Sequence, residues 1–321
     1  MKKQTENIND NIRKVIIIGG GCAGLTTAIY CARAELRPLL FAGNIEDKGG
    51  LLVKTSVVEN YPGCDGILGF DLIENMEKQA IKYGAIVIDK DIIKVNFSDK
   101  TFSVEDSDND VHYAQTVIIA TGSNPNKLTL ENESKFWANG ISSCAVCDGA
   151  LYKNKKIVVV GGGDTAFEHS LFLTKFSDVI LIHRRDTFRA SKIMQKKLFE
   201  NPKITVIYDT AIKELKGKDK LESIIIENVK THEINEIQVD GLFYGLGLKP
   251  NTYLFNDILK LDDEGYIMKF PYKNFETMTS INGVFVAGDV NDKIYRQAIV
   301  AAGDGCKAAL DANNYLTEYE N

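Results

Sequence analysis

Two segments of this 321-residue sequence share one pattern: an apolar run, a glycine-rich turn and a helical stretch. The first is VIIIGGGCAGLTTAIYCARA, from Val15, and the second is IVVVGGGDTAFEHSLFLTKF, from Ile157, about 140 residues later. A continuous apolar run suits a strand that is buried on both faces, and the glycine turn lets a helix N-terminus approach a phosphate. Two such units predict an α/β fold with two Rossmann-like dinucleotide-binding domains.

The end of the chain resembles the first unit, because GVFVAGDV, from Gly283, again reads as a strand and a turn before a helix. We therefore expect the C-terminal part to return to the first domain, with the second domain inserted into it. Pro125 and Pro250 mark the two linkers. The first domain would then comprise residues 1–123 and 252–321, and the inserted domain residues 124–251.

Apolar periodicity and turn residues predict the remaining elements. In the first domain we expect helices at 23–34 and 71–83 and strands at 39–41, 85–88, 92–97, 101–104, 111–113 and 117–120. In the inserted domain we expect strands at 179–183, 204–208, 223–228 and 238–244. The polar residues 1–11 are expected to be disordered.

Charge, hydropathy and cysteine usage exclude several classes of protein. The formal net charge is −6, whereas a nucleic-acid partner usually needs a basic face. No apolar run is long enough to span a bilayer, and no signal-peptide core follows the N-terminal lysines. Six cysteines with one closely spaced pair do not form a secreted disulfide framework. We therefore expect a cytoplasmic protein with no nucleic-acid or membrane partner.

Both glycine turns have the spacing of a dinucleotide site. The first is a GxGxxG pattern and the second a GxGxxA pattern, formed by Gly19, Gly21 and Gly24 and by Gly161, Gly163 and Ala166. The plain alternative is a turn that merely needs glycine. The preceding strand and the following helix favour pyrophosphate binding at the helix N-terminus.

The strand after the second glycine turn ends in His183-Arg184-Arg185-Asp186, with Arg189 shortly after. An NAD site places an acid at this strand end, whereas guanidinium groups would hold a 2′-phosphate by paired hydrogen bonds. The alternative is a solvated basic turn capped by Asp186. The position of the charges favours NADP.

The reactive candidate is Cys144-Ala-Val-Cys147-Asp148. A CxxC pair can close a small disulfide and exchange it through a thiolate. A structural zinc site would need two more ligands, and the chain has no second CxxC and no HxxxH, so we expect no metal. Asp148 is either a proton donor or an ordinary turn residue, and its spacing alone does not decide between them.

Together these motifs resemble the low-molecular-weight thioredoxin reductases over residues 15–315. The sequence around ISSCAVCDGA is most similar to the fungal and plant members of that family. The likeness rests on GGGCAG, VENYPG, ATGS, CAVCDGA, GGGDTA, HRRDTFRAS, AGDV and YRQA, in that order. Cys22, Leu51 and Leu248 depart from the family's usual Pro, Gln and His. We expect these departures to alter the flavin environment or the rate without loss of the reaction.

The resemblance implies FAD and NADPH as cofactors, thioredoxin as the protein substrate, and a homodimer. FAD would contact residues of the first domain and one cysteine: Gly19, Gly20, Gly21, Cys22, Ala23, Gly24, Asn60, Ile92, Cys147, Asp289, Arg296, Gln297 and Ala298. NADPH would contact the second glycine turn and the arginine motif: Gly161, Gly163, Asp164, Thr165, Ala166, His183, Arg184, Arg185 and Arg189. The family assigns Cys147 to the flavin, Cys144 to attack on the substrate, and proton donation to the residue at Asp148.

The implied reaction passes electrons from NADPH through FAD to the Cys144–Cys147 disulfide and then to thioredoxin. The cysteines and the nicotinamide belong to the same inserted domain and need the same flavin, so we expect that domain to rotate on its linkers. One alternative is a related flavoprotein that serves a peroxiredoxin or oxidises a small dithiol without NADPH. The arginine cluster at 184–189 argues against the NADPH-free option. Another is a flavin- or zinc-holding interaction protein without turnover.

Overall fold

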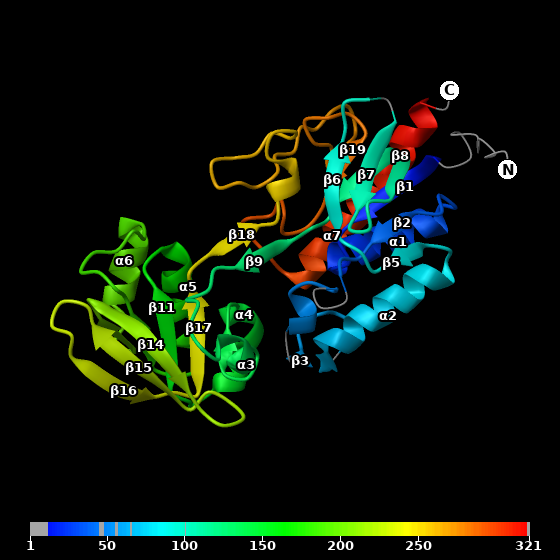
Figure 1. Cartoon of the computed structure of the whole chain (residues 1–321). Helices are drawn as coiled ribbons and strands as arrows, with labels where there is room; N and C mark the ends of the chain where they lie inside the picture. The colour runs from blue at the N-terminus through cyan, green and yellow to red at the C-terminus, as the bar shows by residue number, and fades with distance from the viewer. Residues whose placement is uncertain (1–11, 45–47, 55–56, 65, 100, 320–321) are drawn as a thin grey trace. The chain divides into compact units, whose positions relative to one another are not determined.

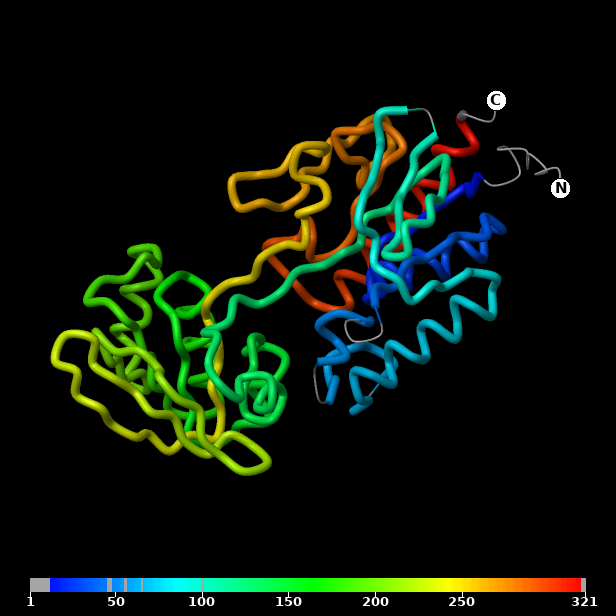
Figure 2. The backbone as a smooth tube through the Cα atoms, viewed as in Figure 1, coloured from blue at the N-terminus to red at the C-terminus, as the bar shows by residue number. Residues whose placement is uncertain are grey.

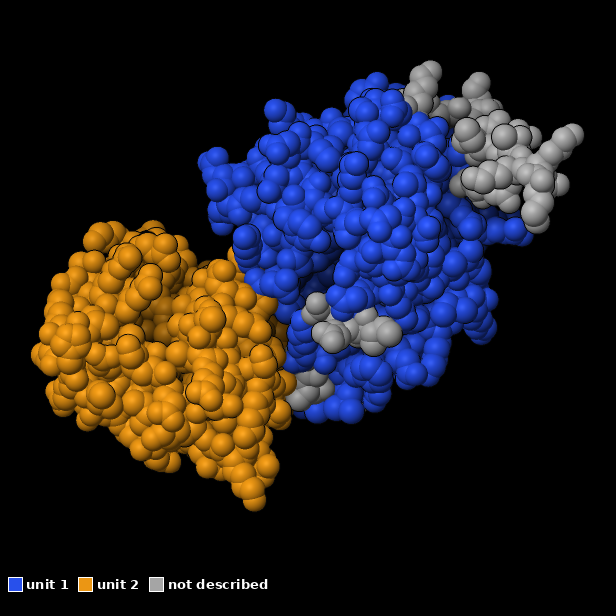
Figure 3. Space-filling view, in the orientation of Figure 1, with its two compact units in different colours: residues 1–124, 249–321 blue, residues 125–248 orange. Residues whose placement is uncertain are grey.

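The structure, a computed structural model, describes residues 12–44, 48–54, 57–64, 66–99 and 101–319. The chain forms two compact units, unit 1 of residues 1–124 and 249–321 and unit 2 of residues 125–248 (Figures 1 and 3). Each contains a largely parallel sheet, so the predicted fold class, two dinucleotide-binding units with the second inserted into the first, is confirmed. The expected disordered lead-in at residues 1–11 lies outside the described residues.

Unit 1 is built on a seven-stranded sheet in the order β5-β2-β1-β8-β7-β6, with β19 also paired to β8. Its strands are β1 (Ile12–Ile18), β2 (Leu39–Phe41), β5 (Ile86–Ile88), β6 (Ile92–Asn96), β7 (Phe102–Asp106), β8 (Val111–Ile119) and β19 (Val284–Val286). Its helices are α1 (Cys22–Arg33), α2 (Gly69–Lys82) and α7 (Ala298–Tyr319), with the short helices η2 (Leu52–Lys54) and η4 (Tyr253–Phe255) and the hairpin β3 (Val57–Val58) and β4 (Ile67–Leu68).

The apolar run of β1 is explained by burial on both faces of this sheet. Val15 and Ile17 belong to the core that α1, α2 and α7 cover, whereas Ile16 and Ile18 belong to the core on the other face. β19 pairs with β8 in parallel, which returns the C-terminal segment to the sheet of the first glycine turn.

Unit 2 has a five-stranded parallel sheet in the order β10-β17-β11-β12-β13 and a three-stranded antiparallel sheet (Figure 1). The parallel strands are β10 (Ile141–Ser142), β11 (Ile157–Gly161), β12 (Val179–Ile182), β13 (Ile204–Ile207) and β17 (Gly241–Gly245). The antiparallel strands are β14 (Thr210–Lys216), β15 (Ser223–Asn228) and β16 (Ile234–Gln238). The helices are α3 (Glu133–Phe136), α4 (Ala145–Asp148), η3 (Gly149–Tyr152), α5 (Asp164–Leu173) and α6 (Lys192–Phe199).

The chain crosses between the units twice, and the two crossings pair as a two-stranded sheet of β9 (Ser123–Pro125) and β18 (Leu248–Pro250) (Figure 2). On the unit 1 side, Asn251 joins them: its N–H donates to Gly122 O at 3.0 Å, and its Oδ1 accepts Asn124 Nδ2–H at 2.9 Å. The two linkers are therefore one paired ribbon.

Some predicted elements were wrong. Residues 111–113 and 117–120 were expected as two strands, but β8 is continuous, because its first part pairs with β7 and its last part with β19. The strand expected at 238–244 is instead the end of β16 and, after a break at Val239 and Asp240, β17. The sequence patterns also missed β14 and α6.

Candidate active site

Cys144 and Cys147 are joined by a disulfide. Cys144 caps the short helix α4, and its Sγ accepts the Cys147 N–H at 3.2 Å. Both cysteines are half-buried, and Val146 between them has 54% of its surface exposed. The pair follows β10, a strand at the edge of the unit 2 sheet. Within unit 2 the turn that holds the disulfide is therefore only partly covered.

Asp148 lies beside the pair and is hydrogen-bonded to Ser142. The Ser142 O–H donates to Asp148 Oδ2 at 2.6 Å, and Ser142 Oγ also accepts the Cys144 N–H at 3.0 Å. Burial raises the pKa of Asp148, and the Ser142 hydrogen bond partly opposes this. A carboxyl group with a raised pKa is suited to hold and deliver a proton. Ser142 was not predicted as a site residue, because its role depends on the turn between β10 and α4.

The first glycine turn fits a bound pyrophosphate. Gly19 has φ +118°, and a Cβ there would overlap Ala120 O. A Cβ on Gly24 would overlap Gly19 O, so Gly24 allows the close packing of α1 on the turn. Gly21 is different, because the nearest atom to its Cβ position is Gly49 O at 3.9 Å. Protein packing does not require Gly21, whereas close approach of a dinucleotide does.

The AGD turn after β19 packs directly on the first glycine turn. A Cβ on Gly288 would lie 2.9 Å from Ala23 Cβ. Burial raises the pKa of the Asp289 carboxyl to about 6, Asp292 adds to this, and Arg296 opposes it. Burial, with a smaller contribution from Asp289, raises the pKa of the Cys22 thiol to about 12. The structure therefore brings the predicted FAD residues Cys22, Ala23 and Asp289 together from the two ends of the chain.

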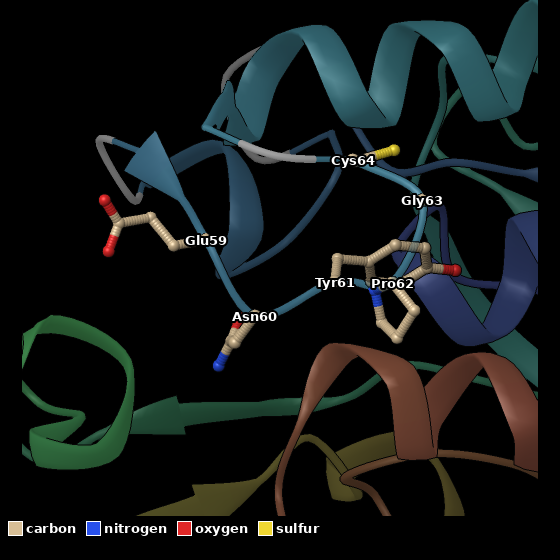
Figure 4. Close-up of a pocket in the computed structure, with 6 residues that line it drawn as sticks. All are labelled: Glu59, Asn60, Tyr61, Pro62, Gly63 and Cys64. Carbon is tan, nitrogen blue, oxygen red and sulfur yellow. The ribbon is translucent and has the colours of Figure 1, made fainter.

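Asn60 and Gln297 also meet, since Asn60 Nδ2 donates to Gln297 Oε1 at 3.3 Å. The loop that holds Asn60, residues 59–64, lines a cavity of about 550 Å³ (Figure 4). Arg296, one residue before Gln297, has the unusual φ of +49°, and its N–H donates to Asp292 Oδ2 at 2.9 Å. Arg296 is therefore held in a left-handed conformation next to Gln297.

Two further observations concern the expected FAD contacts. The Ile92 side chain is only 3% exposed and packs within the apolar core, so only its backbone could face a ligand. The tip of β2 has no acid of its own, but Asp91 reaches it: Asp91 accepts the Asn44 N–H at 3.2 Å and the Asn44 Nδ2–H at 2.9 Å. Asp91 is a candidate site residue that sequence patterns did not reveal.

In the second glycine turn, too, some glycines are required by protein packing and one leaves open space. Gly161 has φ +151°, and a Cβ on Gly162 would strike the His183 ring. No atom lies within 4 Å of the Cβ position of Gly163. Ala166 packs against Gly245 of β17, because a Cβ on Gly245 would overlap the Ala166 side chain. The space at Gly163, at the start of α5, fits a second dinucleotide.

The arginine loop, residues 183–191, is tied to this second glycine turn. The Arg189 N–H donates to Gly162 O, and the Ser191 N–H donates to Asp164 Oδ1, both at 2.8 Å. Phe188 anchors the loop by stacking on His183 and contacting Phe167 edge-on, with ring centroids 4.8 Å apart in both cases. The predicted phosphate ligands Arg184, Arg185 and Arg189 are all exposed.

His183 lies beneath the second glycine turn rather than at the surface. The residue is 8% exposed, and its Nε2 lies 3.0 Å from Thr187 O. Burial lowers the pKa of the imidazole, which keeps it neutral near pH 7. His183 therefore supports the arginine loop by packing, while the arginines supply its positive charge.

The described residues form neither a metal-binding cluster nor a membrane-spanning helix. No group of three or more His, Cys, Asp or Glu side chains in that part of the chain is placed to hold a metal ion. Nor does any helix in the same residues combine the length and apolar character needed to cross a membrane.

Comparison with known proteins decides the family. A sequence profile described as pyridine nucleotide-disulphide oxidoreductase matches residues 13–305. The chain belongs to this family. As a member it is an oxidoreductase that uses FAD and NADPH, and the two cofactors that the resemblance implied are confirmed.

Individual relatives narrow the resemblance to thioredoxin reductases. The thioredoxin reductase of Streptomyces coelicolor is 47% identical, covering 95% of this chain and 94% of the relative. Thioredoxin reductase 2 of Arabidopsis thaliana is also 47% identical, covering 95% of this chain and 82% of the relative. The solved thioredoxin reductase of Giardia duodenalis is 40% identical, with a TM-score of 0.88 and coverage of 95% and 98%. A bacterial relative is thus as similar as a plant one.

Proposed function

We propose that the protein is a thioredoxin-disulfide reductase. The observation that carries the proposal is the Cys144–Cys147 disulfide in unit 2. The same unit contains the second glycine turn, which is hydrogen-bonded to the loop of the three exposed arginines. That unit is inserted into another with its own dinucleotide turn. The relatives at up to 47% identity over nearly the whole chain bear the name thioredoxin reductase.

The two cysteines have different tasks in the proposed exchange. In the reduced protein, the Cys144 thiolate attacks one sulfur of the thioredoxin disulfide, forms a mixed disulfide and expels the other sulfur as a thiolate. The Cys147 thiolate then attacks the Cys144 sulfur, which re-forms the disulfide seen in the structure and releases thioredoxin as a dithiol. When bound, FAD supplies the two-electron transfer that links NADPH to this disulfide.

Asp148 and Ser142 handle a proton in this cycle. The product dithiol needs two protons, and Asp148 is placed next to the pair to deliver one of them. Its raised pKa favours the protonated form, while the Ser142 O–H stabilises the carboxylate left after transfer.

The cofactor residues are proposed from the same fit. Gly21 and the turn around it would hold the FAD pyrophosphate, with Asn60, Asp289 and Gln297 nearby. Gly163 and α5 would hold the pyrophosphate of NADPH, and the arginine loop its 2′-phosphate by charge-assisted hydrogen bonds.

We also propose a homodimer in the cytoplasm. Cys22, Cys31, Cys64 and Cys306 are free thiols, which suits a reducing compartment. Light scattering on the purified protein tests the dimer, and a monomer at micromolar concentration would overturn it.

The deciding assay is NADPH oxidation by the FAD-loaded protein, with thioredoxin, a peroxiredoxin and a small disulfide as separate acceptors. We expect turnover with thioredoxin and its loss in Cys144→Ser and in Cys147→Ser, while NADPH still bleaches the flavin of both variants. Cys306→Ser, which removes a half-buried thiol on α7, is the matched control and should keep full turnover. Turnover with thioredoxin in either variant of the pair would refute the dithiol mechanism.

A further inference from the structure

Lys230 lies at the edge of the arginine loop. The loop follows β12 of the parallel sheet, whereas Lys230 lies between β15 and β16 of the antiparallel sheet. Its Nζ is 3.0 Å from Asp186 Oδ2 and 3.0 Å from Asp209 Oδ2. Asp186 follows Arg185 directly in the loop, and the Asp209 N–H lies 3.4 Å from Arg185 O, its acceptor. Lys230 therefore contacts the two carboxylates that flank the arginines.

These carboxylates work against the binding of a phosphate. The Asp186 side chain is 65% exposed, so its charge faces the same solvent as the arginines. The Debye length at physiological salt is about 8 Å, so a carboxylate within one loop acts on a phosphate held by its neighbours. Lys230 is the cation bound to Asp186 in the described structure, and that contact lowers the pKa of Asp186.

The position of Lys230 is built into the turn between β15 and β16. The Val229 N–H donates to Asp209 O at 2.6 Å, which fixes the turn to the segment after β13. Asn228 Oδ1 accepts the N–H groups of Lys230 at 2.9 Å and of Thr231 at 3.0 Å. The lysine is thus presented by an ordered turn, not by a free chain end.

The arginine loop does not depend on Lys230 for its shape. The bonds from Arg189 to Gly162 and from Ser191 to Asp164, and the packing of Phe188 on His183, hold the loop from its other side. Loss of the lysine should therefore change the charge of the site and leave its backbone in place.

We propose that Lys230 is a specificity-determining residue for NADPH, which screens Asp186 and Asp209 from the 2′-phosphate. This inference rests on the proposed function, because it assumes that the arginine loop receives that phosphate. It gives the three-stranded sheet β14–β16 a role in cofactor choice: its turn supplies a positive charge that no nucleotide motif contains.

The test is calorimetric binding of 2′,5′-ADP and of 5′-AMP to the FAD-loaded protein, because the two probes differ only in the 2′-phosphate. Lys230→Ala should lower the affinity ratio of the two probes by about two- to fivefold, the range for exposed charge pairs. Asp186→Asn should leave the ratio unchanged or raise it. The double variant Asp186→Asn with Lys230→Ala should regain at least half of the loss, on a logarithmic scale.

Two controls separate the possible failures. Lys213→Ala removes a lysine of equal 57% exposure, paired with Glu227 in the same sheet, and should not change the ratio. Arg184→Ala with Arg185→Ala should abolish the preference for 2′,5′-ADP; if it does not, the proposed NADPH site is wrong. If the arginine variant behaves as expected, an unchanged ratio in Lys230→Ala, or a lowered ratio in Asp186→Asn, overturns the screening role alone.

Discussion

At the redox pair, the fold has partly withdrawn the Asp148 carboxyl from water and bonded it to Ser142, whose Oγ also accepts the Cys144 N–H. Burial raises its pKa, and the Ser142 hydrogen bond stabilises the ionised form and so lowers it. A proton donor acts only while it is protonated. The contribution of Asp148 should therefore be lost as the pH rises through its pKa.

Ser142→Ala tests this sign. The substitution removes the hydrogen bond that opposes burial, so the pKa of Asp148 should rise and the alkaline decline of kcat/KM for thioredoxin should move to higher pH. Asp148→Asn should remove this decline and lower the rate by about 10²-fold or more, as expected for loss of a general acid. Ser143→Ala is the neighbouring control. A shift to lower pH in Ser142→Ala would contradict the assignment.

The sequence revealed those site residues whose role depends on local spacing. Cys144 and Cys147 are three residues apart, and the cap of a single turn brings them together. Ser142, Asp91 and Lys230 were not found, because each acts through a contact set by tertiary structure or by a turn whose course the sequence does not show. No spacing rule connects Lys230 with Asp186, which lies 44 residues earlier in the arginine loop.

At the scale of elements, the glycines of each turn serve different purposes. In the turn before α5, a side chain at Gly162 would collide with His183, whereas a side chain at Gly163 would meet no protein atom. Gly163 also has φ −106°, which alanine adopts readily. The fold requires Gly162, and we propose that the bound dinucleotide requires Gly163.

This division predicts opposite effects of two adjacent substitutions. Gly163→Ala should leave the melting temperature of the protein unchanged but weaken NADPH binding by about tenfold or more, a loss of ~1.4 kcal/mol. Gly162→Ala should lower the free energy of unfolding by ~1–3 kcal/mol through overpacking against the imidazole. Thermal melts and NADPH titrations measure both. Unimpaired NADPH binding in Gly163→Ala would move the pyrophosphate away from this turn.

Helix α7 offers a matched pair of glycines. A Cβ on Gly305 would overlap Ala23 O of α1, and the Thr27 O–H donates to Gly305 O at 3.1 Å. Gly303 is exposed, and no atom lies within 4 Å of its Cβ position. Gly303→Ala should stabilise the protein by up to ~1 kcal/mol, because alanine costs less backbone entropy in a helix.

Gly305→Ala should instead destabilise the protein by ~1–3 kcal/mol, because α1 and α7 would have to move apart. Chemical denaturation of both variants measures the difference. Equal effects would show that the contact between α1 and α7 is loose.

The apolar runs before the two glycine turns were located correctly, whereas β8 was divided into two strands because its first half has an exposed face. Residues 15–18 of β1 and 157–160 of β11 are continuous apolar runs, and their positions were expected. The first half of β8 alternates exposed and covered residues, and polar Gln115 and Thr116 follow, so the sequence suggested a break. In the structure, Thr116 Oγ donates to Lys14 O at 2.8 Å, and the strand continues.

For the whole molecule, the insertion makes the paired ribbon of β9 and β18 the backbone connection between the units. The second glycine turn and the Cys144–Cys147 pair belong to unit 2, whereas the first glycine turn belongs to unit 1. A single flavin must then serve two partners carried by one unit. We expect unit 2 to rotate on the ribbon during each cycle, as hinged domains do.

A reversible cross-link between the units tests the rotation. A disulfide engineered from unit 1 to unit 2, away from both glycine turns, should preserve FAD binding but stop multiple turnover with thioredoxin. Selective reduction of the cross-link should restore turnover, and the same two cysteines left uncross-linked are the control. Full steady-state activity with the units demonstrably locked would show that no rotation is needed.

The central claim is that electrons from NADPH reach Cys144 and Cys147, and thiol counting tests it most directly. The FAD-loaded protein is mixed anaerobically with a stoichiometric amount of NADPH, quenched in acid, alkylated and analysed by mass spectrometry. We predict that Cys144 and Cys147 are alkylated only after NADPH is added, while labelling of the other four cysteines is the same with and without it. A bleached flavin with the Cys144–Cys147 disulfide still intact would contradict the account.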